Sequence, residues 1–179
     1  MQTGLLVVDL QPAYAAYSDS IATRVAQRIN RTVKPTTIMW VGEGLTNDCE
    51  GSVREYLRHH GAWPSRLEQA TFVEKGYGFL RGWMDQGVDS SDIIRVGRAL
   101  CAQGVHSSED VDLETLYDGD PPDVPRWDHI QQPGFDDCTL LALDSFETCG
   151  GGSQECLAEM ELWLRILGKP VKRLNALVY

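Results

Sequence analysis

The alternation of short apolar runs with segments of helical periodicity constrains the fold of this chain more than any other feature. The run Leu5–Val8 has four apolar residues in succession, which is typical of a strand buried on both faces of a parallel sheet. The next segment carries Ile21, Val25 and Ile29 four residues apart, as one stripe of an amphipathic helix. Strands alternating with helices predict an α/β fold, a three-layer sandwich with a central parallel sheet.

The same two patterns recur along the rest of the chain. A stripe that extends to Val33 predicts that the first helix is capped by Ser18 or Ser20 and stopped by Pro35. Residues 139–143 fit either a strand or a helix. Further strands are predicted at Thr37–Val41, Thr71–Glu74 (an edge strand), Phe146–Cys149 and Val171–Tyr179, and further helices at Ser52–His60, from Ser90 or Ser91 to about Gly104, and at Gln154–Leu167.

The stretch from Val105 to Pro133 breaks this alternation. It is acidic, it contains Pro121, Pro122 and Pro125, and it shows little periodicity. Structureless loops of this length are uncommon in compact domains unless they have a role. We therefore expect a divergent surface excursion or lid on one domain that spans residues 1–179.

Composition limits the partners that we expect. A hydrophobic content of 42% and a charged content of 23% are ordinary for a globular protein. The net charge is −10 and no cluster of lysine and arginine is present, which argues against binding to nucleic acid or to an anionic membrane. The sequence has neither a leader-like segment nor an apolar run of about 18 residues. We expect a cytoplasmic protein whose partner is a small molecule.

The cysteine and histidine patterns argue against a metal or a redox centre. The five cysteines are irregularly spaced and none forms a CxxC pair, as a zinc ribbon or a dithiol motif would require. The histidines lack ligand-like spacing. We expect no metal and no cofactor, and we expect most of the cysteines to be buried thiols.

Three reactive side chains follow predicted strands. Asp9 ends the first strand, Lys75 follows the Thr71–Glu74 run, and Cys156 stands after a glycine turn behind Phe146–Cys149. Open α/β sheets bind their ligands outside the carboxyl ends of the strands. We therefore expect an acid, a cation and a thiol to meet at one end of the sheet.

The position of Cys156 points to covalent chemistry. It stands at the start of a predicted helix, where the free N–H groups favour a thiolate, and a nearby Lys75 ammonium would lower the thiol pKa further. Asp9 could take the thiol proton and later protonate a leaving amine. The glycines at 150–152 would let backbone N–H groups face an oxyanion. Together these features predict acyl transfer through a thioester.

These motifs resemble those of the isochorismatase-like cysteine hydrolases. Leu5–Gln11 is similar to the opening strand of that family with its Asp-x-Gln, and Lys75–Phe79 is similar to its lysine followed by an aromatic pair. Gly150–Cys156 matches a loop in which glycine lies six positions before the cysteine and a small hydroxyl residue, here Ser153, lies three before it. The resemblance covers both ends of the chain and the lysine segment.

The resemblance implies an isochorismatase-like (Rossmann-like) hydrolase fold, a homo-oligomer, and cleavage of a small amide or related C–N bond. Asp9 would be the general base, Lys75 would support the thiolate and the oxyanion, and Cys156 would be the nucleophile. The N–H groups of Gly152 and Cys156 would form the oxyanion hole, and a cis peptide would fall at Gly151–Gly152. The loop and substrate-binding residues expected are Gly151, Gly152, Ser153, Gln11, Tyr14, Tyr77 and Phe79.

Departures from the family leave two other functions open. The Val105–Pro133 stretch has no counterpart in the family, and typical members continue beyond the last strand of this sequence. These departures favour, as an alternative, a catalytically degenerate small-molecule binding or regulatory protein on the same fold. A third possibility is the non-cysteine chemistry of true isochorismatases, which the presence of Cys156 disfavours. Nicotinamidase-like members carry Asp-x-His after the second strand, whereas this chain has Gly42–Thr46, where we expect no metal.

Each residue also has a simpler interpretation. Asp9 alone could cap a strand end, Lys75 could be solvated, and Cys156 could be a core thiol. Glu155, next to the cysteine, would raise the thiol pKa if it pointed inward, and we expect it to point outward into solvent. Only the combination of acid, cation, glycine-rich loop and thiol favours catalysis.

Overall fold

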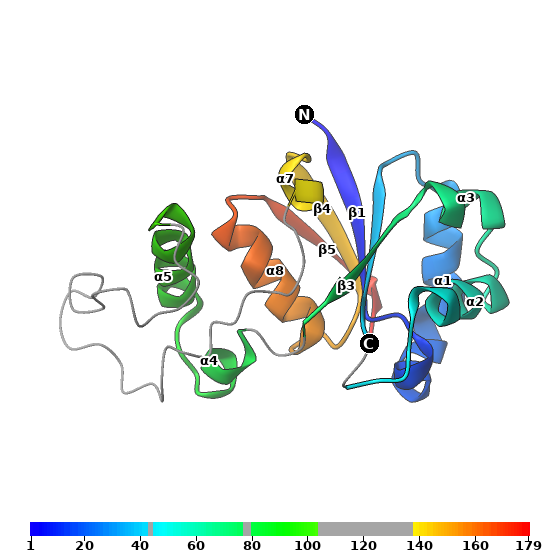
Figure 1. Ribbon diagram of the computed structural model, residues 1–179, viewed down its shortest axis with the longest axis horizontal. Helices are drawn as coiled ribbons and strands as arrows, with labels where there is room; N and C mark the ends of the chain where they lie inside the picture. Colours follow the sequence, from blue (N-terminus) through cyan, green and yellow to red (C-terminus); the bar gives the residue numbers. More distant parts are fainter. Residues whose placement is uncertain (43–44, 77–79, 104–137) are drawn as a thin grey trace.

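The computed structural model describes residues 1–42, 45–76, 80–103 and 138–179. Among these residues a five-stranded parallel sheet has the order β3-β2-β1-β4-β5. This arrangement confirms the predicted α/β class with a central parallel sheet (Figure 1). The strands are β1 (Thr3–Val8), β2 (Thr36–Val41), β3 (Thr71–Lys75), β4 (Ser145–Gly150) and β5 (Val171–Val178).

Helices cover both faces of the sheet and make the three layers of a sandwich. On one side lie α1 (Ala15–Arg31), α2 (Glu50–His59) and α3 (Pro64–Gln69), preceded by the short helix η1 (Pro12–Tyr14). Figure 1 shows α8 against the opposite face, with α5 packed outside it. The helices of that second side are α4 (Arg81–Asp85), α5 (Ser90–Gln103), α7 (Cys138–Leu141) and α8 (Cys156–Ile166).

The apolar run in β1 divides the hydrophobic core into two parts. Leu5 and Val7 pack with α1 and α2, whereas Leu6 and Val8 pack with α8. All four side chains are fully buried, because successive side chains of a strand point to opposite faces and both faces are covered. A strand buried on both faces does not alternate apolar and polar residues. Its unbroken apolar run is the pattern from which it was predicted.

Two details of the first helix differ from the prediction. The helix begins at Ala15, before either serine, because the preceding turn of η1 leads directly into it. It ends at Arg31, where Thr32 turns extended, so that Val33 lies outside the helix and is 92% exposed. The stripe of Ile21, Val25 and Ile29 is buried as predicted.

The other predicted elements have close counterparts. β3 is an edge strand as expected, and residues 138–141 form a helix, which settles the alternative left open there. The short helices α3 and α4 were not predicted, since each spans too few residues to show a period. The predicted excursion at Val105–Pro133 lies outside the described residues. Within the part that is described, no helix has both the length and the apolar character that crossing a membrane requires.

Candidate active site

The strand order creates one favoured position for a ligand. From β1 the chain moves outward to β2 and β3, then returns to place β4 on the opposite side of β1. The connections therefore diverge between β1 and β4, and such a switch point opens a crevice beyond the carboxyl ends of the strands. Asp9 follows β1 and the glycine loop follows β4, so both flank this crevice.

Asp9 stands in a constrained backbone position. Its φ of 49° lies in the left-handed region, where residues other than glycine are uncommon and cost on the order of 1 kcal/mol or more. A hydrogen bond from its N–H to the Met39 carbonyl, at 2.9 Å, fixes the turn against β2. Its side chain is fully buried. Neither carboxylate oxygen has a well-aligned hydrogen bond within the described residues.

Lys75 supplies the positive charge that faces Asp9. It ends the edge strand β3, and its side chain reaches past the end of β2 so that Nζ lies 3.0 Å from Asp9 Oδ2. Both side chains are 0% exposed. A buried charge is tolerated only with a partner of opposite charge. Each of these two side chains can therefore be buried in its charged form because the other is beside it. The prediction that Asp9 and Lys75 meet is confirmed.

The glycine loop is pressed against β1. Gly150 has a φ of 88°, and a Cβ there would lie 2.2 Å from the Val8 carbonyl oxygen, so only glycine fits. The next N–H, that of Gly151, donates to the same Val8 oxygen at 2.7 Å. The expected cis peptide at Gly151–Gly152 is wrong, because no peptide bond between described residues is cis. Glycine torsions alone make the turn, with φ positive at both Gly150 and Gly151.

The backbone N–H groups at the mouth of α8 include the two that an oxyanion hole would use. Gly151 donates to β1, and Ser153 donates to the Tyr179 carbonyl at 2.8 Å. Glu155 N–H and Leu157 N–H both donate to the Gly152 carbonyl. Within the described chain the N–H groups of Gly152 and Cys156 donate to no acceptor, and these are the two donors expected for an oxyanion hole.

Cys156 is the first residue of α8 and is partly buried beside the ion pair. Burial, followed by the negative charge of Asp9, raises the pKa of its thiol to about 12, against the opposing effect of Lys75. The expected thiolate, stabilised by the lysine and the helix mouth, is therefore wrong for the resting protein. The ammonium is already neutralised by Asp9, and burial disfavours a further charge.

A second buried carboxylate, Glu159, was not predicted. It lies three residues after Cys156 on α8 and is 2% exposed, and its Oε1 accepts the Leu80 N–H at 2.6 Å. Burial raises its pKa, and the charges of Lys75 and Asp9 act on it in opposite directions. The available signal was a glutamate among the apolar positions of the helix, one turn from the cysteine.

The remaining predicted residues fall into different environments. Gln11 is buried and its amide is engaged with β2, since Nε2 donates to the Val41 carbonyl and Oε1 accepts the Val41 N–H, both at 2.9 Å. These bonds give Gln11 a structural role without a ligand. Tyr14 lines a pocket beside the cysteine. Tyr77 and Phe79 lie outside the described residues. Glu155 is exposed as expected.

The pocket beside Cys156 has a volume of about 450 Å³, within the range of small-molecule sites. Residues 152–156 line it together with Tyr14, Tyr17 and Tyr179. Tyr17 and Tyr179 were not predicted, and their rings stack with centroids 6.3 Å apart. They come from the first helix and from the residue after the last strand, so no local pattern connects them.

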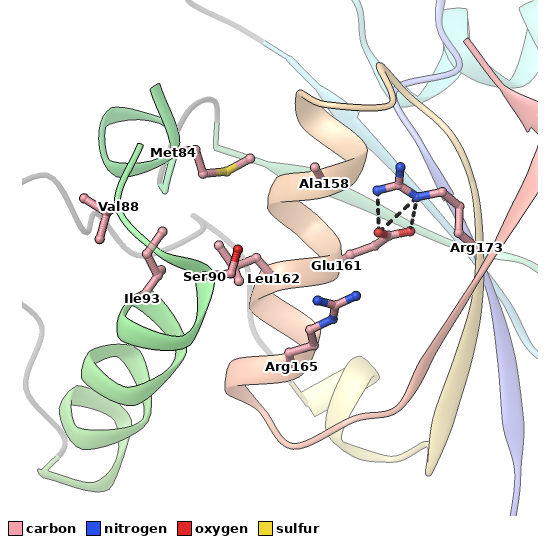
Figure 2. Close-up of a pocket in the computed structure, with 9 residues that line it drawn as sticks. All are labelled: Met84, Val88, Ser90, Ile93, Ala158, Glu161, Leu162, Arg165 and Arg173. Carbon is pink, nitrogen blue, oxygen red and sulfur yellow. Dashed lines mark hydrogen bonds and ion pairs between the residues drawn. The ribbon is translucent and has the colours of Figure 1, made fainter. Parts of the chain in front are cut away.

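A second pocket, of about 280 Å³, lies between α8 and the α4–α5 segment. Figure 2 shows its buried carboxylate, Glu161, in an ion pair with Arg173, while Met84, Val88 and Ile93 form the opposite wall. None of the three candidate catalytic side chains lines it, and of these three Cys156 alone lines the first pocket. The carboxylate of the second pocket is paired with an arginine, so this pocket lacks the thiol of the first.

No metal site is found among the described residues, and no related protein indicates a function. In the described part of the chain no group of three or more histidine, cysteine, aspartate or glutamate side chains is arranged to hold a metal ion. A scan against protein-family models finds no match, and searches of curated proteins and of solved structures find no significant match. The function must therefore be argued from the site itself.

Proposed function

We propose that this protein is a cysteine hydrolase of the isochorismatase-like type, which cleaves a small amide or related C–N bond through a thioester on Cys156. The observation that carries the proposal is the fully buried Asp9–Lys75 ion pair at the switch point, beside a thiol that lines a pocket. A buried acid with accepting capacity, next to a nucleophile at a helix mouth, is the arrangement that acyl transfer requires.

The first step is proton transfer coupled to attack. Because the resting thiol is protonated, Asp9 takes its proton as the Cys156 sulfur attacks the substrate carbonyl carbon. The new C–S bond turns the carbonyl oxygen into an oxyanion, to which the N–H groups of Gly152 and Cys156 donate. Lys75 keeps the surroundings electrically balanced while the negative charge moves from Asp9 to the substrate oxygen.

The later steps return the protein to its starting state. The oxyanion collapses, the C–N bond breaks, and protonated Asp9 gives its proton to the leaving nitrogen. Water then attacks the thioester while Asp9 takes a proton from it. The second oxyanion collapses, the C–S bond breaks, and that proton returns to the Cys156 sulfur. One amide and one water thus become one carboxylic acid and one amine.

The raised thiol pKa supports a second candidate function. A thiol that stays protonated at neutral pH is also compatible with a catalytically degenerate protein that binds a small molecule in the same pocket. The two candidates differ in a single step, because only the hydrolase forms a covalent bond between substrate carbon and the Cys156 sulfur.

The test is turnover and acyl trapping with a panel of small amides. We expect the unaltered protein to release amine, and an acid quench to leave an acyl mass on the peptide that contains Cys156. Cys156→Ala should abolish both signals. Cys49→Ser is the matched control, since Cys49 is exposed and does not line this pocket, and it should behave as the unaltered protein.

Normal turnover in Cys156→Ala would rule out the thioester mechanism. Reversible binding of panel members to the unaltered protein, with neither amine release nor an acyl adduct, would instead establish the binding protein.

A further inference from the structure

The pocket beside Cys156 has an aromatic wall. Tyr14, Tyr17 and Tyr179 line it, and the last two rings are nearly parallel, with an interplanar angle of 18°. Tyr179 is held in place, because its hydroxyl donates to the Asp9 carbonyl at 3.3 Å and its own carbonyl accepts the Ser153 N–H. We call Tyr14, Tyr17, Tyr179 and Glu155 the tyrosine pocket.

Negative charge is in excess around this pocket. Glu155 lines it, and the buried carboxylates of Asp9 and Glu159 both act on Cys156, which also lines it. The Lys75 ammonium forms an ion pair with Asp9, with Nζ 3.0 Å from Oδ2. Of the side chains that line the pocket in the described residues, none is a lysine, arginine or histidine.

The two arginines that contact the described lining of the pocket do not remove this excess. Arg173 donates to the Ser153 carbonyl at 2.8 Å, but its charge is paired with Glu161. Arg81 lies 3.6 Å from Glu155 Oε1, but its Nε lies 2.7 Å from Asp85. Its single charge is therefore shared between two carboxylates.

The same negative charge acts on the hydroxyl group of Tyr179. Burial first, then the negative charge of Asp9, raises the pKa of Tyr179. The phenol is therefore neutral at physiological pH. Its ring presents an electron-rich face, which attracts cations.

We propose that the tyrosine pocket binds a cationic group, so that the substrate is a small amide that also carries an organic cation such as an amidinium, a pyridinium or an alkylammonium. This inference rests on the proposed function for its amide part and adds the charge of the substrate. The tyrosine faces attract the cation, and Glu155 supplies the countercharge at the rim. An anionic substrate would face Glu155 without a basic partner among the described residues that line the pocket.

The experiment compares three flat ligands of nearly the same size and different charge: benzamidinium, benzamide and benzoate. Binding to the full chain carrying Cys156→Ser is measured by calorimetry at pH 7 and low salt, so that no turnover interferes. We expect benzamidinium to bind at least tenfold more tightly than benzoate, with benzamide between them. Equal affinities, or benzoate binding most tightly, would overturn the proposal.

Substitutions in the wall localise the effect. Tyr179→Leu should weaken benzamidinium binding about tenfold, whereas Tyr179→Phe retains the ring and should change it less than threefold. Tyr17→Leu, at a side chain that is 67% exposed, should fold normally and weaken binding several-fold. Arg165→Ala, in the pocket of Figure 2, is the control and should change nothing. Benzamidinium binding that survives both leucine variants would place the cation elsewhere.

The two proposals fail differently. Preference for benzamidinium without acyl trapping on any amide would sustain the tyrosine pocket and refute the hydrolase. Turnover of neutral and anionic amides at the same rate as cationic ones would refute the tyrosine pocket and leave the hydrolase standing.

Discussion

Two buried glutamates lie two residues apart on α8, and the fold treats them in opposite ways. Glu161 accepts hydrogen bonds from Arg173 Nε at 2.9 Å and from Thr148 Oγ1 at 2.6 Å. Glu159 is as deeply buried, yet among the described residues it accepts only backbone N–H groups, and it shares the charge of Lys75 with Asp9. Residue type, burial and helix are the same, whereas the counter-charge and the hydrogen-bond partners differ.

The difference separates a structural region from a functional one. On the Glu161 side every buried charge has its own partner, as in Figure 2. On the Glu159 side two buried carboxylates share, among the described residues, the charge of Lys75, and both raise the pKa of the Cys156 thiol. Perturbed titration concentrates where the fold leaves charges incompletely paired, and such places are candidate active sites.

The largest expected contrast concerns turnover. Asp9→Asn keeps a residue type that tolerates the left-handed backbone and removes the general base, so kcat should fall by roughly 10³-fold. Glu161→Gln should change kcat by less than about threefold, since it alters a carboxylate outside the reaction path. Steady-state kinetics on an amide found in the panel screen measure both. A small effect of Asp9→Asn would place the proton transfer on another group.

The next contrast concerns stability. Lys75→Met leaves the Asp9 carboxylate buried without a partner and should lower the free energy of unfolding by about 3 kcal/mol at pH 7. Arg173→Met should cost less, about 2 kcal/mol, because the Arg173 side chain is already 29% exposed and Glu161 retains Thr148. Urea unfolding measures both.

The double variant Asp9→Asn with Lys75→Met provides the control for that contrast. It removes both buried charges and should recover most of the loss. If the double variant were as unstable as Lys75→Met alone, the ion pair would not explain the stability of this end of the sheet.

The smallest contrast concerns the thiol. The negative charge of Glu159 contributes to the raised pKa of Cys156, so Glu159→Gln should lower that pKa. More thiolate is then present at pH 8, and alkylation of Cys156 by iodoacetamide should quicken roughly two- to fivefold. Glu161→Gln is the matched control and should leave the rate unchanged.

The pH dependence of alkylation tests whether the pKa of the Cys156 thiol is raised in the unaltered protein. With a thiol pKa of about 12, the thiolate fraction rises tenfold per pH unit between pH 7 and 10, and the alkylation rate should rise with it and reach no plateau. A plateau below pH 9 in the unaltered protein would show that the resting sulfur is already an anion.

The sequence by itself determined the layers and the order of the reactive groups. Burial of both faces of β1 demands the unbroken run Leu5–Val8, and helical spacing marks α1 and α8. Asp9, Lys75 and Cys156 were recognisable because parallel strands deliver their carboxyl ends to one edge. These features depend on short-range periodicity, which a sequence displays directly.

Only the tertiary structure decided how the site behaves. The raised pKa of the thiol, the two carboxylates that share the charge of Lys75, and the stacking of Tyr17 on Tyr179 all arise between segments far apart in the chain. The lysine that seemed available to stabilise a thiolate is neutralised by Asp9. A charge acts through its distance from other charges and through its burial, and folding sets both.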